Sequence, residues 1–145
     1  MAESVMAHLD EATAVVMAAA VADFQPSELR ARKIKKREGL RMLRLKPTRD
    51  ILGEIARRRR PERIVVGFAA ETDNVVEHAA QKLRSKRLDL VVANDVTQEG
   101  AGFDVDTNIV TLVFPDAPPA PLEKMPKFDV ANRILDEVVR LRKSR

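Results

Sequence analysis

A short apolar run near the start of the chain places the strongest constraint on its fold. Residues 15–22 are only valine, methionine and alanine, and the run ends abruptly at the carboxylate of Asp23. A continuous run of this length and composition predicts a buried β-strand. Ligands of open α/β sheets bind at the carboxyl ends of strands. We therefore expect a functional site around Asp23, where the small alanines would let a flat ligand such as a nucleobase approach the backbone.

The rest of the chain alternates between strand-like and helix-like segments. Further strands are predicted at residues 40–45, 63–69 and 88–93, and a hairpin with its turn at 106–108 is predicted over residues 100–115. Helices are predicted at residues 4–12, from 48 or 50 to 60, at 74–87 after a capping box, and at 128–142. A proline-rich linker covers residues 115–121. Strands that alternate with helices indicate an α/β fold, with a mostly parallel sheet and helices on both faces.

Composition limits the class of protein. The 145 residues suit one domain, and the net charge of +4 is compatible with phosphate-bearing ligands. The absence of Trp and Tyr argues against a base-stacking surface for nucleic acids. No apolar run approaches the roughly 18–20 residues of a membrane span, and the absence of cysteine fits a reducing compartment. We expect a cytoplasmic protein with no membrane partner.

Familiar nucleotide-binding and catalytic motifs are missing. No glycine precedes a Lys-Ser or Lys-Thr pair, so there is no P-loop, and Gly100-Ala101-Gly102 lacks the third glycine and the helix of a dinucleotide fingerprint. His8 and His78 have no neighbours in the sequence that indicate a metal site or a triad. Both are expected on the surface.

Clustered cations are more informative. Lys82 and Lys86 are four residues apart, so they project from one helix face, and Lys33 belongs to a basic loop with Lys35 and Lys36. Taken alone, the Lys82–Lys86 pair is better explained by a solvated helix face, and the loop cluster by a basic surface loop. Helix C-terminal solvation is the simpler explanation for the arginines at 57–60. A nucleic-acid patch made from the basic residues at 30–37 and 57–60 is the alternative. Charge and periodicity alone indicate an α/β domain that binds an anionic nucleotide.

Taken together, six separated segments resemble phosphopantothenate–cysteine ligase, the synthetase domain of the bifunctional coenzyme A biosynthesis flavoprotein. The segments are AAAVADF at 18–24, KIKK at 33–36, TRDI at 48–51, VGFAAET at 66–72, Gln81-Lys82 with Lys86, and ANDV at 93–96. They occur in the family's order and spacing across nearly the whole chain. The resemblance implies a Rossmann-like fold with a small C-terminal β-hairpin.

The resemblance also implies a reaction. Family members join L-cysteine to 4′-phosphopantothenate, and bacterial members use CTP with Mg²⁺ through an acyl-cytidylate intermediate. It implies a homodimer and a flavin-binding decarboxylase domain, separate or fused, with no flavin bound by this segment. Nucleic acid is not an expected partner.

Site residues carry over motif by motif. Met17, Ala18, Ala19 and Phe68 would line the base and sugar of CTP, and Asp23 would lie near the ribose or a phosphate-bound cation. Thr48, Arg49, Asp50 and Ile51 would supply backbone donors at a helix start, while Lys82 and Lys86 would hold the nucleotide. Lys33 would be the catalytic cation that neutralises charge at the reacting phosphates. Asn94 and Asp95 are candidates for the substrate site.

One departure from the family pattern limits the expected activity. Family members begin with a strand, a Gly-rich turn and a Ser-Ser-Gly-Lys-Met-Gly segment preceded by a catalytic asparagine, and this sequence has none of them. We expect residues 1–145 to form a single domain equivalent to the C-terminal part of the ligase domain. Alternatives are a non-catalytic or split-enzyme partner that needs an N-terminal piece and, more distantly, a basic nucleic-acid-binding module.

Overall fold

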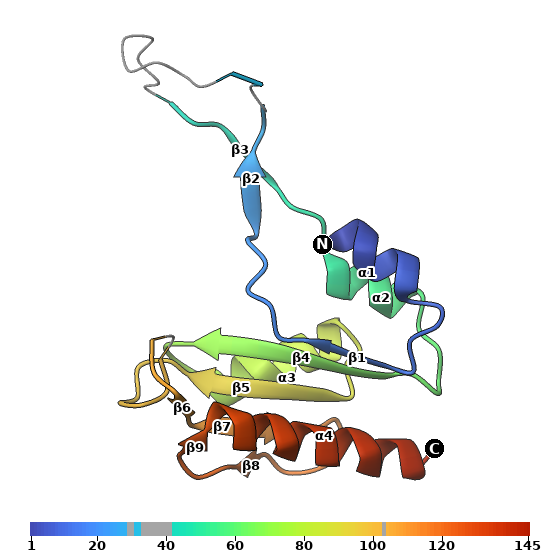
Figure 1. Ribbon diagram of the computed structural model, residues 1–145, viewed down its shortest axis with the longest axis vertical. Helices are drawn as coiled ribbons and strands as arrows, with labels where there is room; N and C mark the ends of the chain where they lie inside the picture. The colour runs from blue at the N-terminus through green and yellow to red at the C-terminus, as the bar shows by residue number, and fades with distance from the viewer. Residues whose placement is uncertain (29–30, 33–41, 103) are drawn as a thin grey trace. The chain divides into compact units, whose positions relative to one another are not determined.

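The computed structural model describes residues 1–28, 31–32, 42–102 and 104–145 (Figure 1). The chain divides into two compact units. Residues 1–18 and 51–145 form the sheet unit, and residues 19–50 form the hairpin unit. The Lys33, Lys35 and Lys36 cluster lies outside the described residues.

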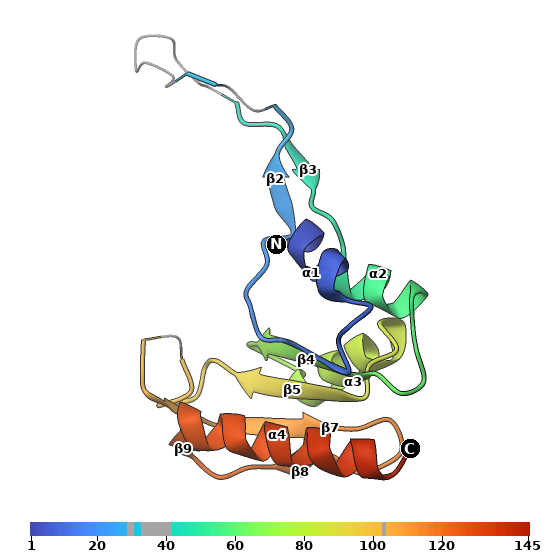
Figure 2. The same cartoon turned by 45° about the vertical axis from the view of Figure 1, so that its right-hand side comes forward.

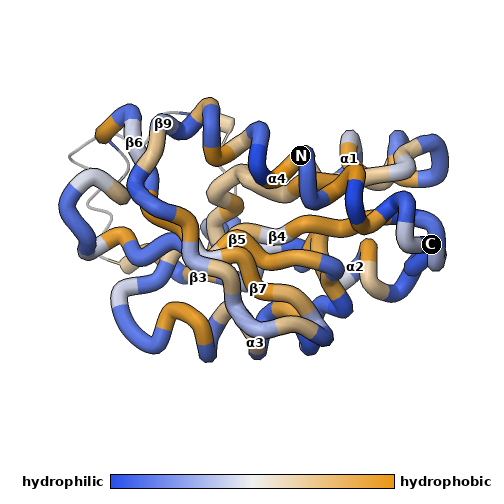
Figure 3. The backbone as a smooth tube through the Cα atoms, turned by 90° about the horizontal axis from the view of Figure 1, so that it is seen from below, coloured by the Kyte–Doolittle hydropathy of each residue, from blue (hydrophilic) through white to orange (hydrophobic). Residues whose placement is uncertain are grey.

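The sheet unit is built on five strands in the order β1-β4-β5-β7-β8. The strands are β1 (Ala14–Met17), β4 (Ile64–Glu71), β5 (Leu90–Asp95), β7 (Val110–Val113) and β8 (Ala120–Pro121). The first three run parallel to one another. β7 pairs antiparallel with β5, and β8 pairs antiparallel with β7. Figure 3 shows the central strands as largely hydrophobic along their length. Such continuous apolar runs are typical of strands that are covered on both faces.

Helices cover both faces of this sheet (Figure 2). α1 (Ala2–His8), α2 (Ile51–Arg57) and α3 (Val75–Ser85) pack into one hydrophobic cluster, while α4 (Lys127–Lys143) packs into the other. Alternate residues of β4 supply each side: Val65 and Ala69 join the first cluster, and Ile64 and Val66 the second. The predicted α/β class, with a mostly parallel sheet between two layers of helices, is confirmed.

The hairpin unit consists of β2 (Phe24–Pro26) and β3 (Leu45–Pro47), which pair antiparallel. Every residue of both strands is exposed. Two hydrogen bonds follow the ladder: the Thr48 backbone N–H donates to the Asp23 carbonyl at 2.8 Å, and the Thr48 hydroxyl donates to the Ala22 carbonyl at 2.6 Å.

The first predicted strand is shorter than expected. β1 ends at Met17, so the prediction that one buried strand continues to Asp23 is wrong. Within the described residues β1 pairs only with β4, so it is an edge strand and only half-buried. Alanine has low strand propensity. Pairing with β4 alone is therefore not enough to keep the alanines after Met17 in the sheet. Asp23 instead directly precedes β2.

Other boundaries also differ from the predictions. β3 covers residues 45–47 and overlaps the predicted strand at 40–45 only at Leu45; residues 40 and 41 are outside the described part. The third parallel strand extends to Asp95, so the polar pair Asn94-Asp95 forms its last two residues. At the start of α3, Asn74 has a left-handed conformation (φ 43°) and makes no side-chain capping bond, so the predicted capping box does not form.

The C-terminal strands are present but have different partners. β6 (Thr107–Asn108) occupies the position predicted as a turn and pairs with β9 (Met125–Pro126). β7 pairs with β5 rather than with the segment before it, and β8 forms inside the predicted linker. On α4, Val130, Ile134 and Val138 are buried as predicted, but Leu135 and Val139 are about half exposed.

None of the helices in the described part of the chain has an apolar stretch long enough to cross a lipid bilayer.

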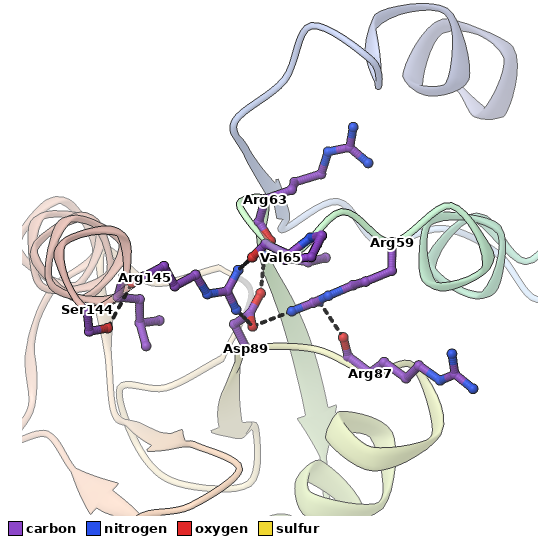
Figure 4. Close-up of polar contacts among 9 residues, drawn as sticks. Arg59, Arg63, Val65, Arg87, Asp89, Ser144 and Arg145 are labelled. Carbon is purple, nitrogen blue, oxygen red and sulfur yellow. Dashed lines mark hydrogen bonds and ion pairs between the residues drawn. The ribbon is translucent and has the colours of Figure 1, made fainter.

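A buried carboxylate connects the elements at the amino ends of the strands (Figure 4). Asp89, which is 5% exposed, accepts hydrogen bonds from the Val65 backbone N–H at 2.7 Å and from the Arg59 guanidinium at 2.6 Å, and it also pairs with Arg145. The two guanidinium groups reach it from opposite sides. Asp89 thus links the start of β4, the segment after α2 and the end of α4.

We predict that Asp89→Ala destabilises the sheet unit strongly. Removal of one partner of a buried ion pair costs about 3–5 kcal/mol because the remaining charge is left unpaired. The matched control is Asp10→Ala, which breaks the exposed Arg60–Asp10 pair (2.9 Å) and should cost about 1 kcal/mol or less. Urea unfolding of both variants measures the difference, and equal losses would contradict the assigned role of Asp89.

Candidate functional site

The carboxyl ends of three parallel strands meet at one edge of the sheet unit. Met17 ends β1 opposite Gly67, and Phe68 follows Gly67 in β4. On the other side of β4, the last two residues of β5 lie at the same edge: Asn94 is opposite Ala70, and Asp95 is opposite Glu71. This is the edge at which open α/β sheets bind their ligands.

A lysine from α3 is fixed at this edge. The Lys82 ammonium donates a hydrogen bond to the Phe68 carbonyl at 2.6 Å, and its side chain is half-buried. Lys86 is the C-cap residue of the same helix, one turn further on, and its backbone N–H bonds the Lys82 carbonyl at 2.9 Å. The structure thus brings Phe68 and Lys82, from different predicted motifs, into direct contact.

Two residues that the sequence analysis missed also belong to this edge. The His78 Nδ1 atom lies 3.3 Å from the Glu71 carboxylate, and His78 is one helical turn before Lys82 on α3. Glu71 ends the apolar run of β4, as Asp23 ends the first apolar run, so the same strand-end signal could have identified it. His78 had no recognisable partner in the sequence because the contact depends on how α3 packs beside β4.

Asn94 has an unused acceptor. Its Nδ2 group donates to the Ala101 carbonyl at 3.0 Å, which fixes the side chain, while Oδ1 is buried and has no hydrogen-bond partner among the described residues. A buried polar atom without a partner is costly. Asn94 is therefore the member of the predicted Asn94–Asp95 pair that retains a free hydrogen-bonding atom.

The Asp95 carboxylate is already occupied by its own loop. It accepts hydrogen bonds from the Thr97 hydroxyl at 2.6 Å, the Thr97 backbone N–H at 3.0 Å and the Gln98 side-chain amide at 3.0 Å. These bonds, above all the one from the Thr97 hydroxyl, hold the pKa of Asp95 below its ordinary value. The arrangement favours a loop-anchoring role for Asp95.

We predict that Thr97→Val raises the pKa of Asp95. Because the folded-state pKa of Asp95 is depressed, its stabilising bonds are present above the unfolded-state pKa and are lost as pH falls through the folded-state pKa. A carboxyl NMR titration should move its midpoint upward in Thr97→Val and leave it unchanged in Thr72→Val. An unchanged midpoint in Thr97→Val would show that the Thr97 hydroxyl does not set this pKa.

The remaining predicted site residues are divided between the two units. Ala18 follows β1 in the sheet unit, and Ile51 begins α2 with its side chain buried at 5% exposure, so only its backbone can reach a ligand. The hairpin unit holds the other described residues of the predicted set, which are Ala19, Asp23, Thr48, Arg49 and Asp50. The Thr48 hydroxyl and N–H are taken up by the Ala22 and Asp23 carbonyls. Lys33 lies outside the described residues.

The arginines that follow α2 have structural partners. Arg59 pairs with Asp89, and Arg60 pairs with Asp10. Arg63, 1% exposed, donates to the carbonyls of Leu9, Ala12 and Arg58. These contacts favour a structural role for this tract over the nucleic-acid patch considered from the sequence.

The sequence model for the C-terminal domain of the DNA/pantothenate metabolism flavoproteins matches residues 1–141. The chain belongs to this family. The family resemblance expected from the six sequence motifs is thereby confirmed.

Individual relatives agree with the family assignment. The chain is 47% identical over 143 residues, 99% of its length, to the coenzyme A biosynthesis bifunctional protein CoaBC of Bacillus subtilis. It is 36% identical over 131 residues to a cysteine/cysteine sulfinic acid decarboxylase from an unknown prokaryotic organism. It spans 35% and 36% of these two proteins, about a third of their length.

A solved structure supports the fold. The crystal structure of the C-terminal domain of a coenzyme A biosynthesis bifunctional protein CoaBC matches with a TM-score of 0.79 at 30% identity. The match covers 99% of this chain and 62% of that one. The Rossmann-like fold, with small additional strands, is therefore common to both.

Proposed function

We propose that this domain serves coenzyme A biosynthesis by the CTP-dependent ligation of L-cysteine to 4′-phosphopantothenate. The observation that carries the proposal is the contact of Lys82 with the Phe68 carbonyl at the carboxyl edge of the sheet. It joins two motifs of the family at the edge where open α/β sheets bind their ligands, and the family match extends over residues 1–141.

The proposed chemistry has two steps. A carboxylate oxygen of 4′-phosphopantothenate attacks the α-phosphorus of CTP, which forms the acyl cytidylate and releases pyrophosphate. The amine of cysteine then attacks the acyl carbon, which forms the amide bond, releases CMP and gives up a proton. Negative charge develops on phosphate oxygens in the first step, so fixed cations lower its barrier.

Each predicted site residue is assigned to one part of CTP. As the family resemblance implies, Met17, Ala18, Ala19 and Phe68 would line the base and sugar of CTP. Lys82 and Lys86 on α3 would hold its phosphates, and Lys33 is proposed as the cation at the reacting centre. Asp23 would lie by the ribose, with backbone donors from residues 49–51, since the Thr48 N–H already bonds the Asp23 carbonyl.

Three further residues complete the proposed site. The free Oδ1 atom of Asn94 is suited to accept a hydrogen bond from a donor group of a substrate, since its Nδ2 group is already bonded. Glu71 and His78 lie beside Lys82 at the same edge and add a carboxylate and an imidazole to it.

The described residues contain no group of three His, Cys, Asp or Glu side chains that could hold a metal ion. Mg²⁺ commonly reaches such sites through phosphate oxygens and water, with few protein ligands. The Mg²⁺ proposed here would accordingly arrive with CTP and neutralise part of its charge, with Asp23 as a weak candidate ligand.

We predict that Lys82→Gln weakens CTP binding about tenfold or more, since a hydrogen bond to a charged group contributes about 1.5–3 kcal/mol. Isothermal titration of Mg·CTP measures the change. Arg84→Gln is the matched control because Arg84 is an exposed cation on the same helix. Equal affinities for both variants would remove Lys82 from the nucleotide site.

We predict that the chain by itself binds CTP weakly and turns it over slowly or not at all. Pyrophosphate release in the presence of CTP, 4′-phosphopantothenate and cysteine measures turnover. A rate comparable to that of an intact homologue would contradict this prediction.

The exposed edge of the sheet favours a second candidate role, that of one half of a split ligase. Within the described residues β1 has no strand on its outer side, and Val16 is 41% exposed. A free parallel edge with apolar surface is suited to receive another strand. Ligase activity that appears only when the N-terminal part of a homologous ligase domain is added in trans would support this role.

The hairpin unit is the basis for the proposed homodimer. Its apolar side chains are largely exposed, with Phe24 at 60%, Leu43 at 57% and Leu45 at 55%. An isolated two-stranded ribbon is marginally stable in water, so a second copy that covers these side chains would stabilise it. Sedimentation should show a dimer for the wild-type chain and a monomer for Phe24→Ser/Leu45→Ser.

A further inference from the structure

A cavity lies at the opposite edge of the sheet unit from the candidate site, where the parallel strands begin. It has a volume of about 680 Å³ and is lined by Thr13, Arg59, Pro61, Glu62, Arg142 and Arg145. Thr13 directly precedes β1, and Pro61 and Glu62 shortly precede β4. The cavity therefore shares no residue with the candidate nucleotide site at the carboxyl edge.

The charges around this cavity are predominantly positive. Arg59, Arg142 and Arg145 face one lining carboxylate, Glu62. Behind the lining, the single carboxylate of Asp89 is shared by Arg59 and Arg145. Arg63 is buried nearby, and its guanidinium donates to three backbone carbonyls, so these contacts do not neutralise its charge. Four arginines and two carboxylates leave a net charge of +2.

Two of the lining arginines are held in place before any ligand binds. Arg59 donates to the Arg87 carbonyl and to Asp89, both at 2.6 Å, and Arg145 donates to the Arg63 carbonyl at 2.9 Å and also to Asp89 (Figure 4). Their side chains nevertheless remain 25% and 30% exposed. Each guanidinium carries five N–H donors. Side chains that are already ordered lose little conformational entropy on binding, which favours affinity.

We propose that this cavity is a binding site for a small phosphate-bearing anion. Arg59 and Arg145 would present fixed donors at its base, and Arg142 on the last turn of α4 would close over the anion. The planar guanidinium matches phosphate oxygens in paired hydrogen bonds. The site is independent of the proposed ligase activity, because it lies at the other end of the strands.

The test is the binding of inorganic phosphate, followed by NMR at constant ionic strength with chloride as the reference anion. Arg142→Gln should weaken phosphate binding about tenfold, as expected for one charge-assisted bond. Arg133→Gln is the matched control, since Arg133 is an exposed arginine of α4 that does not line the cavity. Its affinity for phosphate should equal that of the wild-type chain.

Lys82→Gln separates this site from the nucleotide site. It should retain the phosphate response at residues around Thr13 and Glu62, and Arg142→Gln should retain CTP binding. The proposal is overturned if Arg142→Gln binds phosphate like the wild-type chain, or if Lys82→Gln abolishes the phosphate response.

Discussion

The parallel pairing of β4 with a neighbour on each side is the constraint on which the rest of the sheet unit depends. β4 lies between β1 and β5, and its alternate residues enter separate hydrophobic clusters on the two faces. A strand in this position needs helices on both sides, which α3 and α4 supply. Parallel pairing also gathers the carboxyl ends of three strands at one edge and their amino ends at the other. The two edges have different chemistry as a result.

The two edges of the sheet unit differ in the polar groups that they present. Asp89 satisfies a backbone N–H and two guanidinium groups at the amino edge. At the carboxyl edge, Asn94 Oδ1 has no partner among the described residues, and the Lys82 ammonium donates to the Phe68 carbonyl. The buried Asn94 Oδ1 atom is an acceptor that a substrate donor at the carboxyl edge would satisfy, whereas the amino edge offers arginine N–H donors around its cavity.

The sequence predicted the elements better than their ends. The apolar runs of β4 and β5 and the 3.6-residue pattern of α4 are local signals, and all three were found. Among the described residues β1 pairs with β4 alone, and its end at Met17 depends on that long-range pairing, which no local pattern reports. The contact between Lys82 and Phe68 could be expected from motifs, but the Glu71–His78 contact and the role of Asp89 could not. Both join residues through the packing of helices against the sheet.

Hydrogen–deuterium exchange with and without Mg·CTP tests the central claim most directly, because it reports where along the chain the nucleotide binds. Binding at the carboxyl edge predicts slower exchange at the ends of β1, β4 and β5, especially around Phe68 and Asn94, and in α3 near Lys82. The experiment is run with Arg142→Gln, which weakens the proposed phosphate cavity, and the amino edge around Thr13 and Asp89 should then be unchanged. Protection confined to the amino edge, or no protection at saturating CTP, would contradict the claim.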